Sequence, residues 1–92
     1  MIVRIATEGQ FRVGSAALDR LNEIDNTLMA AVAADDGAGF SRLLGELLAV
    51  VRGKGQPVAT AEIVESDIIL PPPDTSLAEA RHLFQVDGLI PG

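Results

Sequence analysis

Two stretches of this chain carry apolar residues at helical spacing, and a short turn-forming segment separates them. In the first stretch the residues recur at intervals of three and four: Leu18, Leu21, Ile24, Leu28 and Val32. In the second stretch the stripe is wider: Phe40, Leu43, Leu44, Leu47, Leu48 at its margin, Val50 and Val51. Such spacing places side chains on one face of a helix. A short loop between two such helices predicts an antiparallel helical hairpin, with the wide stripe packed on two neighbours.

The flanking residues predict where these helices begin and end. Ser15 is the predicted N-cap of the first helix, which should run to about Ala34. Residues 35–39, Asp-Asp-Gly-Ala-Gly, interrupt the pattern, and the two aspartates favour the N-terminus of the second helix. Gly53 or Gly55 is predicted to end the second helix.

Alternating apolar residues predict strands before the helices. Residues 2–5 and 10–13 have a period of two, and Gly9 between them can supply a positive φ for a tight turn. They are predicted to form an antiparallel hairpin. A lone hairpin is marginally stable in water, so the helices should cover its apolar face.

The last third of the chain has a different pattern. Pro57 is interpreted as a break, and a short third strand is expected within 62–70, at 67–70. Residues 71–73 are three prolines, which cannot join a central ladder and hold the preceding residue extended. Residues 76–79 have the pattern of a capping box, so a short third helix is expected to close near Gly88. The predicted fold class is therefore α+β, in one domain over residues 1–92.

Charge and composition narrow the classes of function. Thirteen acidic and seven basic residues give a formal charge of −6, and the basic residues are scattered, so direct nucleic-acid binding is not expected. The chain has no cysteine, which excludes disulfides and thiolate sites. No apolar run approaches the roughly 20 residues of a membrane span, and the N-terminus lacks a signal-peptide pattern. A cytoplasmic protein is expected.

No group of residues predicts catalysis, cofactor binding or metal binding. His82 with Glu79 could form a general base, but a solvated helix position explains His82 without any partner. Asp35 with Asp36, and the acidic residues in 65–67, lack the spaced oxygen ligands of a calcium loop. Turn and capping roles account for them. The chain is not expected to be an enzyme.

Asp25 falls inside the apolar stripe of the first helix rather than on its polar face. A carboxylate there is costly unless it is hydrogen-bonded or paired. In the favoured interpretation Asp25 fixes the structure by bonding loop amides, Arg4 or Arg12. In the alternative it is a docking carboxylate beside an apolar groove.

A candidate partner surface lies near the end of the chain. It comprises Asp67, Pro71, Pro72, Pro73, Leu89 and Ile90. Stiff, extended proline segments are surfaces that partner proteins recognise. The same residues could equally be a rigid connector laid over the core, with the C-terminal tail packed beside it.

Several segments, in their order along the chain, resemble the family of PspA-associated proteins called PspAA. They are residues 1–5, 8–11, 21–26, 43–52, 66–74, 79–81 and 88–92. The likeness spans essentially the whole chain and departs at residues 37–39, where better helix formers are expected. It implies a partner of a phage-shock-type PspA, a coiled-coil membrane-remodelling protein of the envelope stress response, and it implies no catalytic residues.

The predicted function is that of a non-catalytic adaptor or regulator acting by protein–protein contact, with a PspA-like coiled-coil protein as partner. One alternative is a small winged-helix-like transcriptional accessory protein, because helices after a hairpin can resemble such a module. Another is an enzyme subunit whose site is completed by a partner. The small core and the wide stripes are compatible with a homodimer.

Overall fold

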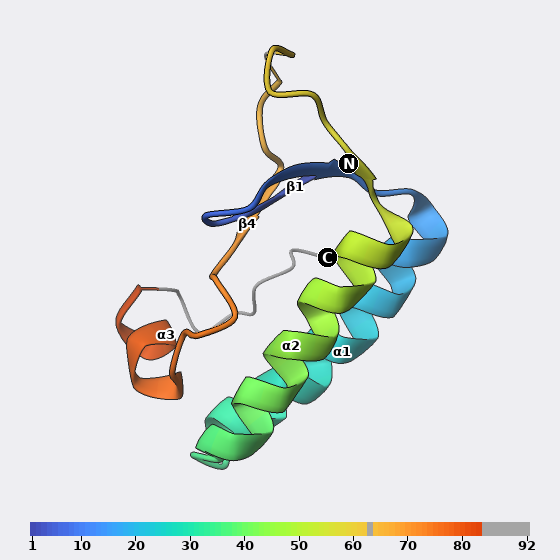
Figure 1. Cartoon of the computed structure of the whole chain (residues 1–92). Coiled ribbons are helices and arrows are strands. Elements are labelled where there is room, and N and C mark those ends of the chain that lie inside the picture. The colour runs from blue at the N-terminus through green and yellow to red at the C-terminus, as the bar shows by residue number, and fades with distance from the viewer. Residues whose placement is uncertain (63, 84–92) are drawn as a thin grey trace.

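The computed structural model describes residues 1–62 and 64–83, and in these residues it contains four strands and three helices. In chain order they are β1 (Ile2–Ile5), β2 (Gly9–Arg12), α1 (Ser15–Ala33), α2 (Gly37–Lys54), β3 (Gln56–Pro57), β4 (Ile68–Leu70) and α3 (Leu77–Leu83). The strand hairpin, the two long helices, the strand expected at 67–70 and the short third helix are all present. The predicted α+β class is confirmed (Figure 1).

The strands form one sheet in the order β3-β2-β1-β4. β1 pairs antiparallel with β2, as predicted, and parallel with β4. β3 was not predicted, and the interpretation of Pro57 as a break is wrong, because Pro57 pairs with Phe11. An edge strand tolerates proline, since one side of it needs no ladder hydrogen bond. Two residues are also too few to produce a periodic signal.

A tight turn joins β1 to β2. The Glu8 amide donates to the Ile5 carbonyl over 2.9 Å. Gly9 has a φ of 117°, which confirms the predicted positive φ. Thr7 also has a positive φ, 74°, which its β-branched side chain gave no reason to expect.

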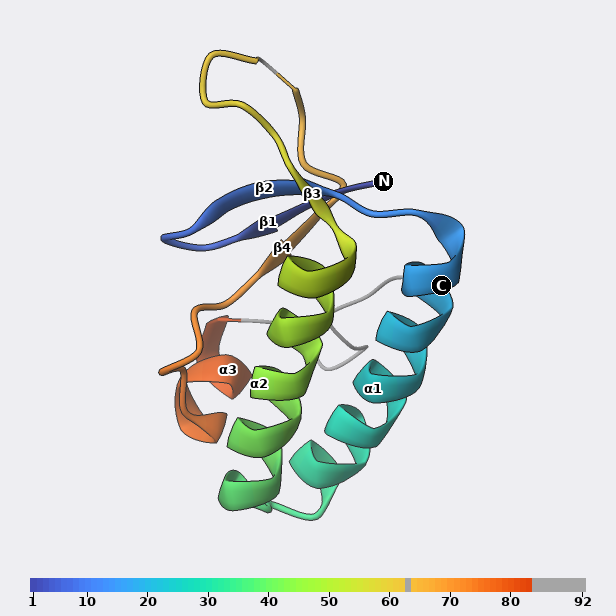
Figure 2. The same cartoon turned by 45° about the vertical axis from the view of Figure 1, so that its right-hand side comes forward.

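The helices cover one face of the sheet, and the segment between β3 and β4 rises from the other (Figures 1 and 2). Val3, Ile5 and Leu70 have no exposed surface, and Ile68 is 4% exposed. Alternation along each strand places these side chains on the face toward the helices. The residues between them in sequence, Arg4 among them, therefore lie on the open face.

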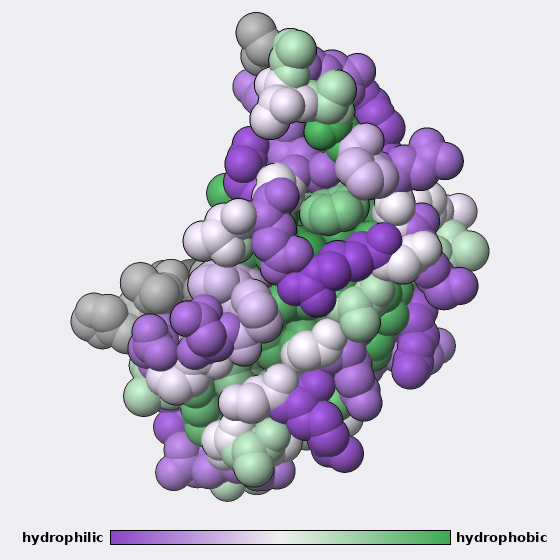
Figure 3. Space-filling model, in the orientation of Figure 1, coloured by the Kyte–Doolittle hydropathy of each residue, from purple (hydrophilic) through white to green (hydrophobic). Residues whose placement is uncertain are grey.

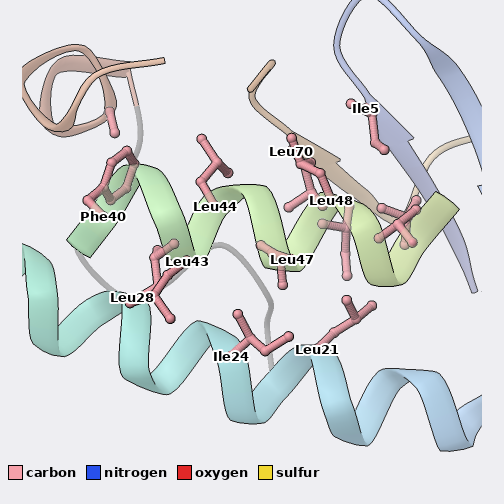
Figure 4. Close-up of a cluster of buried hydrophobic side chains, with 14 of the residues drawn as sticks. Ile5, Leu21, Ile24, Leu28, Phe40, Leu43, Leu44, Leu47, Leu48 and Leu70 are labelled. Carbon is pink, nitrogen blue, oxygen red and sulfur yellow. The ribbon is translucent and has the colours of Figure 1, made fainter. Parts of the chain in front are cut away.

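The core lies between the sheet and the helical hairpin (Figure 4). In Figure 4 Leu43 and Leu47 of α2 point toward α1, whereas Leu44 lies on the opposite side of the helix, near Leu70. All but Leu43, which is 7% exposed, are completely buried. The wide stripe of α2 thus packs on two neighbours, as its width predicted.

The connection between α1 and α2 is shorter than expected because both of its aspartates have specific backbone roles. Asp35 has a φ of 57°, its amide donates to the Val32 carbonyl, and the Asp36 amide donates to the Ala31 carbonyl. This is the Schellman pattern that closes a helix. The Asp36 side chain then accepts from the Gly39 amide and caps α2, so α2 begins at Gly37.

The predicted N-cap of the first helix is wrong by one residue. Gly14 occupies the cap position of α1 without a side-chain hydrogen bond, and Ser15 is the first helical residue. The end predicted for the second helix is confirmed at Gly55, whose amide donates to the Val51 carbonyl. The capping box is also confirmed: the Ser76 amide and the Glu79 side chain, and the Glu79 amide and the Ser76 hydroxyl, bond over 3.1 Å each. The expected end of the third helix, near Gly88, lies outside the described residues.

Replacing Gly45 by alanine is expected to raise the free energy of unfolding by about 0.5–1 kcal/mol, because alanine loses less backbone entropy in a helix. A Cβ at Gly45 meets no atom within 4 Å, whereas one at Gly39 would lie 2.2 Å from Oδ2 of the capping Asp36. Gly39→Ala is therefore expected to be about 1 kcal/mol less stable than Gly45→Ala. Urea denaturation of both variants measures this, and equal stabilities would contradict the assigned cap.

Candidate docking surface on the open face of the sheet

The open face carries a row of three side chains across three strands. Ile69 of β4 is paired with Arg4 of β1, and Arg4 is paired with Gln10 of β2. Ile69 is 57% exposed although its neighbours in sequence are buried. Among the described residues, the large hydrophobic side chains that are exposed are Ile69 and Met1, which is 43% exposed. Ile69 lies in β4, and Met1 directly precedes β1.

The segment between β3 and β4 is held over the β2 side of this face. Nε2 of Gln10 donates to the Val64 carbonyl over 3.0 Å and to the Ser66 hydroxyl over 2.9 Å. Farther along β2, the Arg12 guanidinium bonds the Glu62 carboxylate over 2.7 Å. These contacts hold the segment over the β2 side chains, whereas Arg4 of β1 and Ile69 of β4 are exposed.

A hollow of about 540 Å³ lies between the sheet and this segment. It is lined by Arg4, Glu8, Gly9, Gln10, Phe11, Pro57, Val58, Ala59, Thr60, Glu62 and Val64. Its lining combines aliphatic side chains with three charged ones, so it suits an amphipathic side chain rather than a fully apolar ligand. Arg4 belongs both to the hollow and to the exposed row.

The charged groups of the hollow differ in their pairing. Glu62 is paired with Arg12, and Glu8 is held by two hydrogen bonds from Arg52 at the end of α2. The hydrogen bond from Arg52 is the main reason that the pKa of Glu8 lies below its ordinary value of 4.5, and it raises the pKa of Arg52. Arg4 makes no ion pair with any residue in the described ranges. Its guanidinium can therefore bind a carboxylate of another molecule.

The lowered pKa of Glu8 predicts a pH-dependent contribution to stability. A carboxyl with a folded-state pKa below its unfolded value stabilises the fold above the unfolded pKa, and this contribution is lost as the pH falls through the folded pKa. Glu8→Gln should thus be less stable than the wild type at neutral pH and converge with it in acid. Thermal melts across this range, with Arg52→Gln and the double variant, measure the effect. A double variant whose loss is the sum of the single losses would contradict the pairing.

The candidate partner surface predicted near the end of the chain is divided by the structure. Asp67 is exposed, and its backbone and carboxylate bond the backbone of Ile2 over 2.8 and 2.7 Å, which anchors the start of β4. Pro71 is completely buried, Pro72 is half-buried and Pro73 is exposed. Pro71 therefore packs against the core, whereas Pro73 is exposed to solvent. Leu89 and Ile90 lie outside the described residues.

Asp25 is buried, with 5% of its surface exposed, in the middle of α1. Arg4 and Arg12, which were considered as its partners, lie on the open face of the sheet, and Arg12 bonds Glu62. Asp25 does have an interaction partner. Its burial agrees with the predicted position of Asp25 inside the apolar stripe of the first helix.

The acidic residues considered as metal ligands have structural roles. Asp35 bonds Arg81 of α3 over 2.8 Å, and Asp36 caps α2. In the described part of the chain, no three His, Asp or Glu side chains are grouped so that they could hold a metal ion. His82 lies in α3, and its side chain is outside the described part.

The spacing of residues in the sequence did not identify Arg4 and Ile69 as members of one site. Arg4 belongs to the alternating stretch 2–5, whereas Ile69 lies in an apolar run that predicted a short strand without indicating which side chain faces outward, and their pairing depends on the parallel contact between β1 and β4. No local pattern links them, because Ile69 follows Arg4 by 65 positions in the sequence.

Taken together, the molecule is a small α+β protein in which, in the described residues, a helical hairpin packs on one face of a four-stranded sheet (Figure 2). The other face carries the exposed Ile69 and the hollow beside Arg4. In the view of Figure 3, hydrophilic residues form most of the outline, and hydrophobic residues show between the sheet and the helices. No helix among the described residues has the length and hydropathy needed to cross a membrane.

The chain belongs to the PspAA family: the family model, described as PspA-associated protein, matches residues 1–92. This confirms the resemblance noted from the sequence. The comparisons with curated proteins and with solved structures give no match.

Proposed function

We propose that this chain is a non-catalytic adaptor that regulates a PspA-type coiled-coil protein by direct contact, within the phage-shock response to envelope stress. The observation that carries this proposal is the family match over all 92 residues. The family description names association with PspA, and association requires a surface on this chain that the partner recognises. The contact would take place in the cytoplasm, the expected location of this protein.

The open face of the sheet supports a function in binding. It presents an exposed aliphatic side chain and, next to it, a guanidinium that lines a hollow, so a partner lying on this face would bury apolar surface and meet a charged group. The formal charge of −6 would favour encounter with a partner that has basic stretches. Salt should then slow the association, because it screens exposed charges over about 10 Å at 0.1 M.

The winged-helix-like alternative receives no support from the arrangement of the helices. A helix-turn-helix crosses its two helices at about 90–120°. Here α1 and α2 lie side by side as an antiparallel hairpin (Figures 1 and 2).

The test is capture of a PspA-type protein from the native cells with the tagged chain, followed by titration of the two purified proteins. Saturable binding that slows with added salt is expected. If the purified PspA-family protein of the same genome shows no binding, the proposed function is wrong.

A further inference from the structure

We propose that the β1–β4 half of the open face is the surface that contacts the PspA-type partner, where Arg4 receives a carboxylate of the partner and Ile69 is covered by an aliphatic side chain next to that carboxylate. This inference rests on the proposed function and names the surface and its chemistry. Three features of the described residues carry it: an exposed aliphatic residue, a guanidinium next to it that has no ion pair, and a hollow that is lined by this guanidinium.

Ile69 is the first feature. β4 buries Ile68 and Leu70 on the helix side, so the strand needs no apolar residue at the position between them, where a polar side chain would be usual on a solvated sheet face. Ile69 nevertheless has 57% of its surface exposed. A partner that covers it removes this apolar surface from water.

Arg4 is the second feature. Four of the arginines, Arg12, Arg20, Arg52 and Arg81, have carboxylate partners. Arg4 has none within the described ranges, although Glu8 and Glu62 line the same hollow, because those two carboxylates are held by other arginines. A guanidinium binds a carboxylate through two parallel hydrogen bonds, so a carboxylate is the group that complements this position.

The hollow is the third feature, and it sets the direction of approach. Its 540 Å³ lie on the Gln10 side of Arg4, where a side chain of the partner can enter. β4 has three residues, and Pro71 directly after it has no amide hydrogen to donate, so β4 offers only a short edge for strand addition. The partner is therefore expected to lie across the face, over Ile69 and Arg4, and to place a side chain in the hollow.

The acidic net charge does not conflict with a carboxylate at Arg4. Net charge acts over long distances and affects the rate of encounter, whereas a pair at the centre of a contact affects how long the complex lasts. A partner that is basic overall would be attracted by the acidic net charge, and one acidic residue at its contact surface would pair with Arg4.

The experiment uses the full chain and, as the probe, the purified PspA-family protein encoded in the same genome, with affinity measured by fluorescence anisotropy. Arg4→Glu should weaken binding by about tenfold or more, because it sets two carboxylates against each other. Ile69→Thr keeps a β-branched residue in the strand and should weaken binding severalfold. Arg4→Lys should bind better than Arg4→Glu.

Arg42→Glu is the matched control. Arg42 is exposed on α2 and has no ion pair in the described part of the chain, so its reversal makes the same change of charge on a surface of the helices. It should bind like the wild type once salt is high enough to screen long-range effects. Circular dichroism melts of each variant establish that the fold is retained.

The possible outcomes separate this inference from the proposed function. If the wild type binds and Arg4→Glu and Ile69→Thr bind equally well, the surface is wrong and the proposed function stands. If the two variants turn a dimer into a monomer and leave partner binding unchanged, the face belongs to a second copy and the inference is overturned. If the wild type itself does not bind, the proposed function fails and this inference fails with it.

Discussion

Leu47→Ala is expected to lower the free energy of unfolding by about 2–5 kcal/mol. Leu47 has no exposed surface and points from α2 toward α1, where Leu21 and Ile24 line the opposite side (Figure 4). Truncation removes a buried isobutyl group and leaves a cavity that two helices joined by a short loop cannot easily close. In a domain of this size, each kcal/mol corresponds to about 4–8 °C in melting temperature.

The neighbouring Glu46 supplies the control for this prediction. Glu46 is exposed, and Glu46→Ala should change the free energy of unfolding by no more than about 0.5 kcal/mol. Urea denaturation of the wild type and both variants, with the slope of each transition compared, measures the difference. Equal loss in the two variants would mean that Leu47 is not in a tightly packed core.

Asp25→Ala is expected to lower the free energy of unfolding by about 1–3 kcal/mol. Asp25 is 5% exposed and has an interaction partner, so its replacement by alanine removes an interaction made from a buried position. A decrease of this size would appear as a clear drop in melting temperature. The structural interpretation of Asp25 predicts this loss in the isolated chain.

Asp25→Asn tests what the carboxylate contributes, because the amide keeps the shape and one acceptor but removes the charge. An intermediate stability is expected. An unchanged melting temperature in both variants, combined with weaker binding of the PspA-family protein, would favour the docking interpretation and remove the structural one.

The two long helices could be predicted because their evidence is local. A stripe such as Leu21, Ile24 and Leu28 repeats over several turns, and side chains three and four positions apart lie together in a helix whatever surrounds them. The same holds for the capping box and for Gly9, whose conformational freedom suits the turn in which it lies. The width of the second stripe even indicated two packing neighbours.

The missed strand β3 depends on the backbone of another segment, whereas the error at Asp35 concerns a local capping contact. β3 exists because Gln56 and Pro57 lie next to Arg12 and Phe11 of β2, and no pattern within two residues records that contact. The loop at Asp35 was expected to be longer because glycines usually mark a break. Asp36 caps the next helix through its side chain, which lets Gly37 become helical.

Less of the candidate site than of the fold could be predicted from the sequence. The proline segment was selected because it is unusual in sequence, yet Pro71 is buried. The row from Ile69 to Gln10 has ordinary residues at ordinary strand positions. It exists because β4 joins the sheet beside β1, after two helices and a long loop have intervened.

Periodicity and turn-forming residues were thus enough to establish an α+β chain, its helical hairpin and its first strand pair, since each of these depends on residues close together along the polypeptide. Packing of distant segments established the strand order, the burial of Pro71 and the exposure of Ile69 beside Arg4. The physical reason is that burial and pairing between remote residues depend on where the whole backbone runs, and short-range spacing carries no record of that path.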